Sequence, residues 1–417
     1  MKTIIVLFSC FLLCQIVTSS AETATIAAES CSRDHVNTAI GASAHGDTIT
    51  IPDGSCTWTS GVDVNKRVMI QALNSTPVQY GRSTQSVIIL NNSSTPLFTL
   101  TTGDDYHTGL RGIRFNEGTR TSNHIYASGS GTKIALLNDI YMEQYEKFGT
   151  ASLVASIRWD ALGGIWWDTY FYGKDAVQNY GGEAIRISSP KTWATASTMG
   201  TLDTGGLTNL YVEDCTFQNT RNSFDFDTNS RVVVRYSHFD CSNATHHGLT
   251  SNPGARHTEW YNNTFSNTVS ECNIGERYLW VRGGTTIMTG NVVNNDVDTG
   301  SYIGDATQIV IGENGDDYGS YPPSSAPTQY MPGWGHNGSA YISDPIYIWS
   351  NTGIRAGTYG WISAYWEGMV AITRDLIITG AKPDYVSYTY PHPLRGGGSP
   401  ATGSHRGVSI SGGVSIR

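Results

Sequence analysis

Two aspartates in the run SFDFDT begin the part of the sequence that is richest in reactive side chains. Asp225 and Asp227 alternate with Phe224 and Phe226. This alternation predicts a strand with the phenylalanines in the core and the carboxylates facing solvent, about 6.6 Å apart by Cα. Such a pair suits inverting glycoside hydrolysis, which needs its acid and base about 6.5–9.5 Å apart. It equally suits Ca²⁺, which binds Asp oxygens, or a solvated strand face with no chemical role.

Basic side chains follow the aspartates within a short stretch of chain. They include His247, Arg256, His257, Arg277 and Arg282. Cleavage of a uronate by β-elimination needs a cation against the sugar carboxylate, a base for the C5 proton and an acid for the leaving oxygen. Arginine or Ca²⁺ can serve the first role, and His, Lys, Tyr or an arginine with a lowered pKa can serve the second.

These residue types predict a site with two kinds of member. The predicted catalytic residues are Asp227, His247, Arg256 and Arg282, and the predicted substrate-binding residues include His257 and Arg277. A structural role stays open for the arginines, because Arg256 can pair with Glu259 and Arg282 can cap the turn before Gly283.

Aromatic residues are dense between 159 and 193. Flat aromatic faces stack on sugar rings while their polar tips form hydrogen bonds. We therefore predict that Trp166, Trp167 and Tyr170 contact a polysaccharide. Packing in the core or under loops is the alternative, since it accounts for most aromatic side chains in any protein.

The composition favours an exported β protein. Only 15% of the 417 residues are charged, while Gly reaches 46 and Tyr 23, and this is not the profile of a cytosolic α/β enzyme. A net charge of −9 without any basic run argues against a nucleic-acid partner. An acidic or neutral polysaccharide remains compatible, because arginines can gather locally on an acidic protein.

The first residues resemble a secretory signal. Lys2 precedes an apolar run from 4 to 17, and small polar residues follow it. The run is shorter than the roughly 20 residues that cross a bilayer, so we expect a signal peptide over 1–19 and no membrane span. These features predict a secreted or cell-surface protein, with one domain over 20–395 and a flexible Gly/Ser-rich tail over 396–417.

A repeat of strand-like segments runs through the centre of the chain. Its equivalent residues are Phe217, Phe239, Phe265 and Val293, at steps of 22, 26 and 28 residues, with earlier candidates at Phe115, Ile140 and Phe171. A period in the twenties without amphipathic helices predicts a β-solenoid. A β-sandwich is the alternative. It does not explain why Asn263 and Asn291 share one repeat position, where their amides could stack.

A short amphipathic helix is expected at the N-terminal end of the solenoid. Val36, Ala39 and Ile40 follow a helical period, and Gly46 can end the helix. Because an exposed solenoid end invites edge pairing, we interpret residues 31–56 as a cap over the core.

Five cysteines follow the signal segment: Cys31, Cys56, Cys215, Cys241 and Cys272. Their spacing matches no zinc motif, and outside the cytosol pairing is the default. We predict a Cys31–Cys56 bridge that fastens the cap to the first repeat. A Cys215–Cys241 bridge could join consecutive repeats, with Cys272 as a competitor.

Three blocks of sequence resemble secreted bacterial proteins of the pectate-lyase-like superfamily. They are GDTITIPDGSCTWTSG followed by VMIQAL, the central run from RVVVRYSHFD to TTIMTGNVV, and the C-terminal KPDYVSYTYPHPLR. The resemblance covers most of 31–395 and implies an all-β fold, a single right-handed parallel β-helix with long loops on one flank. Lyases of this superfamily commonly use a basic residue on the helix face, and Arg256 and His247 match that type. The superfamily also includes hydrolases, epimerases and adhesins, so the fold alone does not determine the function.

The leading expectation is a secreted polysaccharide lyase that cleaves a uronate-containing glycan. A glycoside hydrolase of the same fold is one alternative, and a non-catalytic glycan-binding or adhesive surface protein is another. Calcium on Asp225 and Asp227 is the one cofactor that the residues suggest. The sequence leaves the oligomeric state undetermined.

Overall fold

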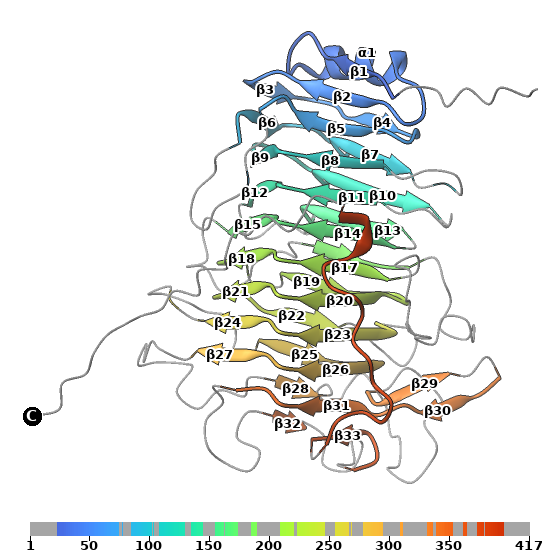
Figure 1. The fold of residues 1–417 in the computed structure, drawn as a ribbon. Coiled ribbons are helices and arrows are strands. Elements are labelled where there is room, and N and C mark those ends of the chain that lie inside the picture. The colour runs from blue at the N-terminus through green and yellow to red at the C-terminus, as the bar shows by residue number, and fades with distance from the viewer. Residues whose placement is uncertain are drawn as a thin grey trace, which may run out of the picture.

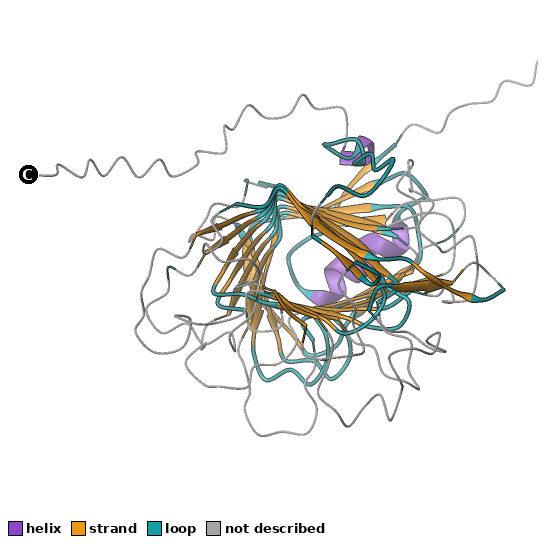
Figure 2. Ribbon diagram, turned by 90° about the horizontal axis from the view of Figure 1, so that it is seen from below, coloured by secondary structure: helices purple, strands orange, loops and turns teal. Residues whose placement is uncertain are grey.

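Each strand of the coil pairs in parallel with the strands one turn earlier and one turn later, so three long sheets surround one core (Figure 1). Viewed along its axis, the chain is a parallel β-helix closed at one end by a helix (Figure 2). The predicted solenoid is therefore confirmed. The computed structural model describes residues 23–74, 77, 85–101, 103, 108–129, 135–144, 155–161, 163–173, 185–189, 209–220, 223–246, 255–266, 268, 278–294, 309–311, 332–336, 339–352, 362–364, 373–378 and 380–395.

We name the three sheets A, B and C in the order in which the chain visits them. Sheet A contains β1 (Thr25–Ala27), β2 (Thr48–Ile51), β5 (Met69–Ala72), β8 (Thr108–Arg111), β11 (Ala135–Asn138), β14 (Gly164–Trp167), β17 (Leu210–Glu213), β20 (Arg231–Arg235), β23 (His257–Tyr261), β26 (Thr285–Thr289), β31 (Ile346–Trp349) and β33 (Leu376–Ile377). Sheet B contains β3 (Gly54–Trp58), β6 (Val87–Asn91), β9 (Ile113–Glu117), β12 (Tyr141–Gln144), β15 (Tyr170–Gly173), β18 (Thr216–Gln218), β21 (His238–Asp240), β24 (Thr264–Ser266) and β27 (Val292–Asn294). Sheet C contains β4 (Val62–Val64), β7 (Phe98–Thr101), β10 (Ile125–Gly129), β13 (Ile157–Ala161), β16 (Ile185–Ile187), β19 (Phe224–Phe226), β22 (Ala244–His246), β25 (Leu279–Val281), β28 (Ile309–Ile311) and β32 (Ile362–Ala364). An antiparallel hairpin, β29 (Trp334–His336) and β30 (Tyr341–Ser343), projects near the C-terminal end.

The phenylalanines of the repeat form a stack on the inner face of sheet B. Phe171, Phe217, Phe239 and Phe265 are in register, with successive ring centroids 4.8, 4.8 and 5.1 Å apart. Such stacked rings add to the stabilisation that comes from burying them. One turn before Phe171 the register places Met142. The assignment of Ile140 to this position was wrong, because Ile140 lies in the turn that precedes β12.

A ladder of side chains supports the corner between sheets A and B. The backbone N–H of Ser237 donates to Asn263 Oδ1 over 3.0 Å, that of Asn263 to Asn291 Oδ1 over 3.0 Å, and that of Asn291 to Asn351 Oδ1 over 2.9 Å. The predicted stacking of Asn263 on Asn291 is confirmed, with the two amides bonded over 3.0 Å. The ladder satisfies backbone donors at a corner that no strand pairing reaches.

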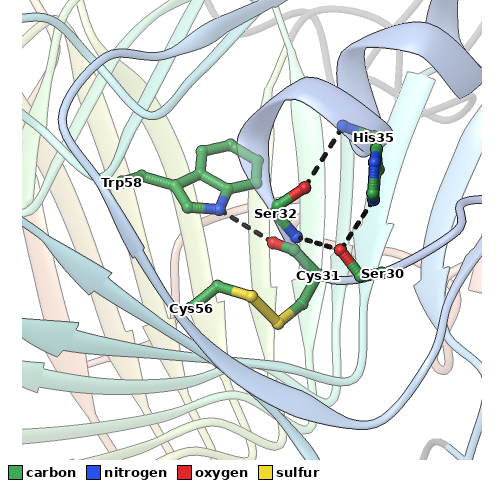
Figure 3. The surroundings of a disulfide bond; sticks show 6 residues. All are labelled: Ser30, Cys31, Ser32, His35, Cys56 and Trp58. Carbon is green, nitrogen blue, oxygen red and sulfur yellow. Dashed lines mark hydrogen bonds between the residues drawn. A yellow bond between two sulfur atoms is a disulfide. The ribbon is translucent and has the colours of Figure 1, made fainter.

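The N-terminal cap is a single helix joined to the first coil by a disulfide (Figure 3). Helix α1 (Arg33–Ala42) buries Val36, Ala39 and Ile40, and Ser32 caps it by accepting from the backbone N–H of His35. It ends before Gly46, at Ser43. Cys31 is bonded to Cys56, and the Trp58 indole donates to the Cys31 carbonyl over 2.9 Å. Along the described ranges, no helix is long and apolar enough to cross a membrane.

The second predicted disulfide is wrong. Cys215 is a buried free thiol, while Cys241 is disulfide-bonded to a partner outside the described residues. The reason is register. Cys215 lies in the corner before β18, where the equivalent residue one turn later is Ser237, whereas Cys241 lies in the corner after β21. The two cysteines therefore lie at opposite ends of two paired strands, β18 and β21.

Residues 382–395, which we call the C-terminal strap, lie on the outer face of sheet A. Figure 1 shows this segment crossing the sheet from β33 toward β14, and it ends in a short 3-10 helix, η2 (Pro393–Arg395). Beneath it, Tyr388 packs with Ile165, Tyr211, Val233 and Tyr261 in a second apolar cluster. The strap therefore gives this face a covered layer of its own, outside the main core.

Candidate functional site

A row of polar and aromatic side chains lies in register on the outer face of sheet C. From β10 to β25 the equivalent positions hold Tyr126, Arg158, Arg186, Asp225, Thr245 and Trp280. Neighbouring strands are about 4.8 Å apart, so charges and rings repeat at short intervals along the coil. Arg158 and Arg186 expose 53% and 44% of their side chains, which makes both guanidinium groups accessible to a ligand in solution.

Both exposed arginines are held by carboxylates. Arg158 Nε donates to Asp160 Oδ2 over 2.7 Å, and Arg186 Nε donates to Asp227 Oδ2 over 3.0 Å. The Arg158 guanidinium also lies over the Tyr126 ring, 5.6 Å from its centroid. Burial, aided by Asp160, raises the pKa of Tyr126. Because a planar guanidinium held in place loses little freedom on binding, these two arginines are suited to a carboxylate ligand.

The aspartates of SFDFDT lie on this face, but they do not face open solvent. Phe224 and Phe226 are in the core as predicted, while Asp225 and Asp227 are only 1% and 3% exposed. Asp227 Oδ1 accepts from the backbone N–H of Thr228 over 2.8 Å and from its hydroxyl over 3.2 Å, and Oδ2 accepts from Arg186. The Asp227 carboxylate is therefore already bonded within the protein. The expectation that both carboxylates face solvent was wrong, because an alternating pattern shows which face a residue is on but not what covers that face.

The two aspartates do not by themselves fit a calcium ion. Calcium takes six to eight oxygen ligands, and a carboxylate bound by an arginine is a poor one. Nowhere in the described ranges do three or more His, Cys, Asp or Glu form a group that could hold a metal.

Two buried arginines meet at the corner where sheet C leads into sheet A, which we call the arginine corner. Arg231 begins β20, and Arg256 directly precedes β23 on the next turn. The backbone N–H of Arg256 donates to the Ser230 carbonyl over 2.9 Å. Burial, reinforced by the charge of Arg256, lowers the pKa of Arg231 to about 9. Burial also lowers the pKa of Arg256, while Asp344 opposes that effect.

Polar atoms that suit a ligand flank Arg231. Its Nη1 donates to the Asn229 carbonyl over 2.5 Å. The Asn229 Oδ1 and the Ser230 hydroxyl are buried, and neither has a hydrogen-bond partner within the described part of the chain. Because buried polar atoms are nearly always bonded, a polar ligand at this corner would satisfy them.

His257 and Glu259 lie behind the arginine corner. His257 is in register with Arg231, and its Nδ1 and Nε2 are 2.6 Å from Thr285 Oγ1 and 3.0 Å from Glu259 Oε1. With both ring nitrogens engaged, His257 is better suited to supporting Arg231 than to the substrate contact expected of it. Glu259 is thus committed to His257, and the carboxylate beside Arg256 is Asp344 at 3.8 Å.

The three predicted sugar-binding aromatics do not share one face of the coil. Trp166 has no exposed surface and packs in the core beside Trp159, so its expected contact with substrate is wrong. Trp167 lies on the outer face of sheet A under Arg395. Tyr170 lies on sheet B, is 1% exposed and stacks on Tyr141. Consecutive strand residues face opposite ways, so neighbouring aromatics could not share one binding surface.

Of the remaining predicted residues, only Arg282 lies in the part of the chain that the structure describes. The Arg282 guanidinium lies over the Trp280 ring, 4.9 Å from its centroid, directly after β25 of sheet C. His247 and Arg277 lie outside the described residues. The sequence reasoning missed Arg158, Arg186, Arg231 and Trp280. For Arg158 and Arg186 the signal was the alternation of apolar and polar residues in IRWD and AIRI, the same pattern that marked SFDFDT.

No protein-family model matches the sequence, and no curated protein matches it. Among solved structures, the chain is similar to a mutant of the PL6 family alginate lyase AlyGC, at 14% identity and a TM-score of 0.42 over 87% of this chain and 52% of that one. It is also similar to a PL6 alginate lyase in complex with a trisaccharide, at 12% identity and a TM-score of 0.42 over 80% of this chain and 74% of that one. A complex of the alginate lyase AlyF-OU02 gives 12% identity and a TM-score of 0.37 over 86% of this chain and 79% of that one. The chain spans about half the length of the first of these (52%), and at such values the function has to be argued from this chain's own residues.

Proposed function

We propose that this protein is a polysaccharide lyase that cleaves a uronate-containing glycan by β-elimination at the arginine corner. The observation that carries the proposal is Arg231, a buried guanidinium whose pKa is lowered to about 9 beside a second buried arginine. A general base works best when its pKa is near the working pH. An arginine in water stays protonated, so only this kind of environment makes it useful as a base.

The proposed reaction uses the two arginines in different roles. The neutral guanidine of Arg231 takes the C5 proton, the electron pair forms the C4–C5 double bond, and the bond from C4 to the leaving oxygen breaks. Arg256 supplies fixed positive charge against the sugar carboxylate, whose negative charge grows as the proton leaves. The proton held by Arg231 then passes to the leaving oxygen, so the step is balanced without a second acid.

The row on sheet C would hold the polymer next to the corner. Arg158 and Arg186 offer two accessible guanidinium groups on adjacent strands, which suits carboxylates that repeat along a uronate chain. Trp280, two strands beyond Asp225, offers an aromatic face backed by Arg282. The polymer would therefore lie along the coil axis, across the strands of sheet C.

The test is turnover on defined polymers. Pectate, alginate, glucuronan and a neutral glycan are incubated with the protein, each with added calcium and with EDTA. Unsaturated uronate ends, seen by their ultraviolet absorbance, are expected with at least one acidic polymer and with no neutral one. New reducing ends without that absorbance would contradict a lyase.

A non-catalytic glycan-binding protein is the second candidate, and one observation favours it. Arg231 and Arg256 are 4% and 1% exposed, whereas the sheet C arginines are open to solvent. Binding of an acidic glycan without turnover, lost in Arg158→Ala and Arg186→Ala and retained in Arg231→Ala, would support this candidate. A hydrolase is not favoured, because Asp227 is held by Arg186 and Thr228.

A further inference from the structure

The C-terminal strap reaches the arginine corner through two carboxylates. Lys382 and Tyr385 are its residues on that side of sheet A. Lys382 Nζ lies 3.5 Å from Asp344 Oδ1, and the Tyr385 hydroxyl donates to Glu259 Oε2 over 2.8 Å. The second oxygen of Asp344 lies toward Arg256, and the second oxygen of Glu259 lies toward His257. Each carboxylate therefore connects the strap to the arginine corner.

The first connection runs through Asp344. Its Oδ2 is 3.8 Å from Arg256 Nη1, and it directly follows the β29–β30 hairpin. The close approach depends on Gly335, where an added Cβ would lie 2.8 Å from Arg256 Nη2 and 3.0 Å from Asp344 Oδ2. A larger residue at 335 would force the arginine and the aspartate to move. The hairpin therefore brings to Arg256 a carboxylate that Lys382 holds from the other side.

The second connection runs through Glu259, which has no exposed surface. Its Oε1 is 3.0 Å from His257 Nε2, and its Oε2 accepts from the Tyr385 hydroxyl. Burial, with Glu259 next to it, raises the pKa of Tyr385, so the hydroxyl remains a donor. The Tyr385 ring packs edge-on against Trp349, 5.5 Å between centroids. The chain of contacts ends beside Arg231, which is the register partner of His257.

We propose that Lys382 and Tyr385 are positioning residues that hold Arg256 and Arg231 in their working arrangement. The inference rests on the proposed function, since it assigns the strap a part in that same site. Tyr385 lies 126 residues beyond Glu259 in the sequence, so the corner is complete only when the strap is in place. The loss of a group that orients a functional residue through an intervening contact typically lowers activity by about 10–100-fold.

The test compares two hydroxyl deletions within the strap. Tyr385→Phe removes the bond to Glu259 and keeps the ring on Trp349. Tyr390→Phe is the matched control, because the Tyr390 hydroxyl donates to Asp214 over 2.8 Å, just after β17 and so at the opposite strand ends from Arg231. Tyr385→Phe is expected to lower kcat about 10-fold or more and to alter the pH–rate profile, with KM little changed. Tyr390→Phe is expected to keep both. An equal loss of kcat in the two variants would show that the strap contributes stability alone and would overturn the proposal.

A second measurement separates this proposal from the proposed function. The ring-nitrogen chemical shifts of His257 report its hydrogen bonds and can be recorded without any substrate. They are expected to change in Tyr385→Phe and not in Tyr390→Phe. If no polymer is cleaved but these shifts change as expected, the lyase assignment fails and the connection from strap to corner stands. If the shifts do not change, the positioning role is wrong whatever the activity.

Discussion

Arg235 and Glu213 form an ion pair in which neither side chain has any exposed surface, on the outer face of a sheet and not in the core. Arg235 also donates to the carbonyls of Tyr388 and Thr389 in the strap, over 2.8 and 2.7 Å. Arg235 Nη1 also donates to the Tyr261 hydroxyl over 2.7 Å. The strap is thus fixed to sheet A by a charge that it also hides from water.

Removing Arg235 should therefore destabilise the protein strongly. Arg235→Ala breaks this buried ion pair and leaves the Glu213 carboxylate with Arg395 alone, at 3.0 Å, and breaking a buried pair typically costs about 3–5 kcal/mol. Urea unfolding followed by tryptophan fluorescence measures the change. Asp34→Ala is a suitable control, since Asp34 is 86% exposed and pairs with Arg33 at 3.0 Å, and the loss of such an exposed pair should cost about 1 kcal/mol or less. Equal costs for the two variants would contradict a structural role for the buried pair.

Activity should increase with pH if Arg231 is the base. Its pKa is about 9 because of burial and of Arg256, and only the neutral form can accept the C5 proton. The rate at saturating polymer is expected to rise through about pH 9 and to level off above it, where the neutral form predominates. Arg231→Ala should lower kcat about 10²–10⁴-fold. An acid optimum, or full activity in this variant, would rule out Arg231 as the base.

The same group should make stability depend on pH. In the unfolded chain an arginine keeps its ordinary pKa, whereas burial beside Arg256 lowers the pKa of Arg231 in the folded chain to about 9. Between these values the unfolded state binds more protons, so this group makes stability rise with pH there. Arg231→Met removes the contribution. The difference between wild type and variant in urea midpoint should therefore shift in favour of the wild type on going from pH 8 to about pH 10.

Reduction of the Cys31–Cys56 bridge should loosen the N-terminal cap. The bond closes a loop with a sequence separation of 25, and loss of a native bridge of this size costs about 2–5 kcal/mol. A Cys31→Ser, Cys56→Ser double variant should show faster hydrogen exchange in α1 and β3 than in the central coils. Uniform loss of protection along the chain would mean that the cap is not a separate unit.

The periodic features of the fold were predictable from the sequence because each turn buries the same kind of residue. Phe217, Phe239 and Phe265 recur at steps of 22 and 26 residues, and the structure stacks them. The site was harder to predict. Arg231 and Arg256 meet because one turn of the coil brings Arg256 back beside Ser230 and Arg231, and the length of chain between two positions does not reveal their register. Trp166 and Trp167 were indistinguishable by type, although one of two adjacent strand residues must face the core.

The position of the strap also has a consequence for the order of folding. A coil of parallel strands can grow by adding each turn to the one before it, starting from the cap. The middle of sheet A cannot be finished in this way, because Arg395 bonds Glu213 across 182 residues of sequence. While the chain is being made or exported, Tyr211, Val233 and the Arg235–Glu213 pair remain uncovered until the strap emerges. Such distant contacts are slow to form, so we expect the last step of folding to be the closing of this face.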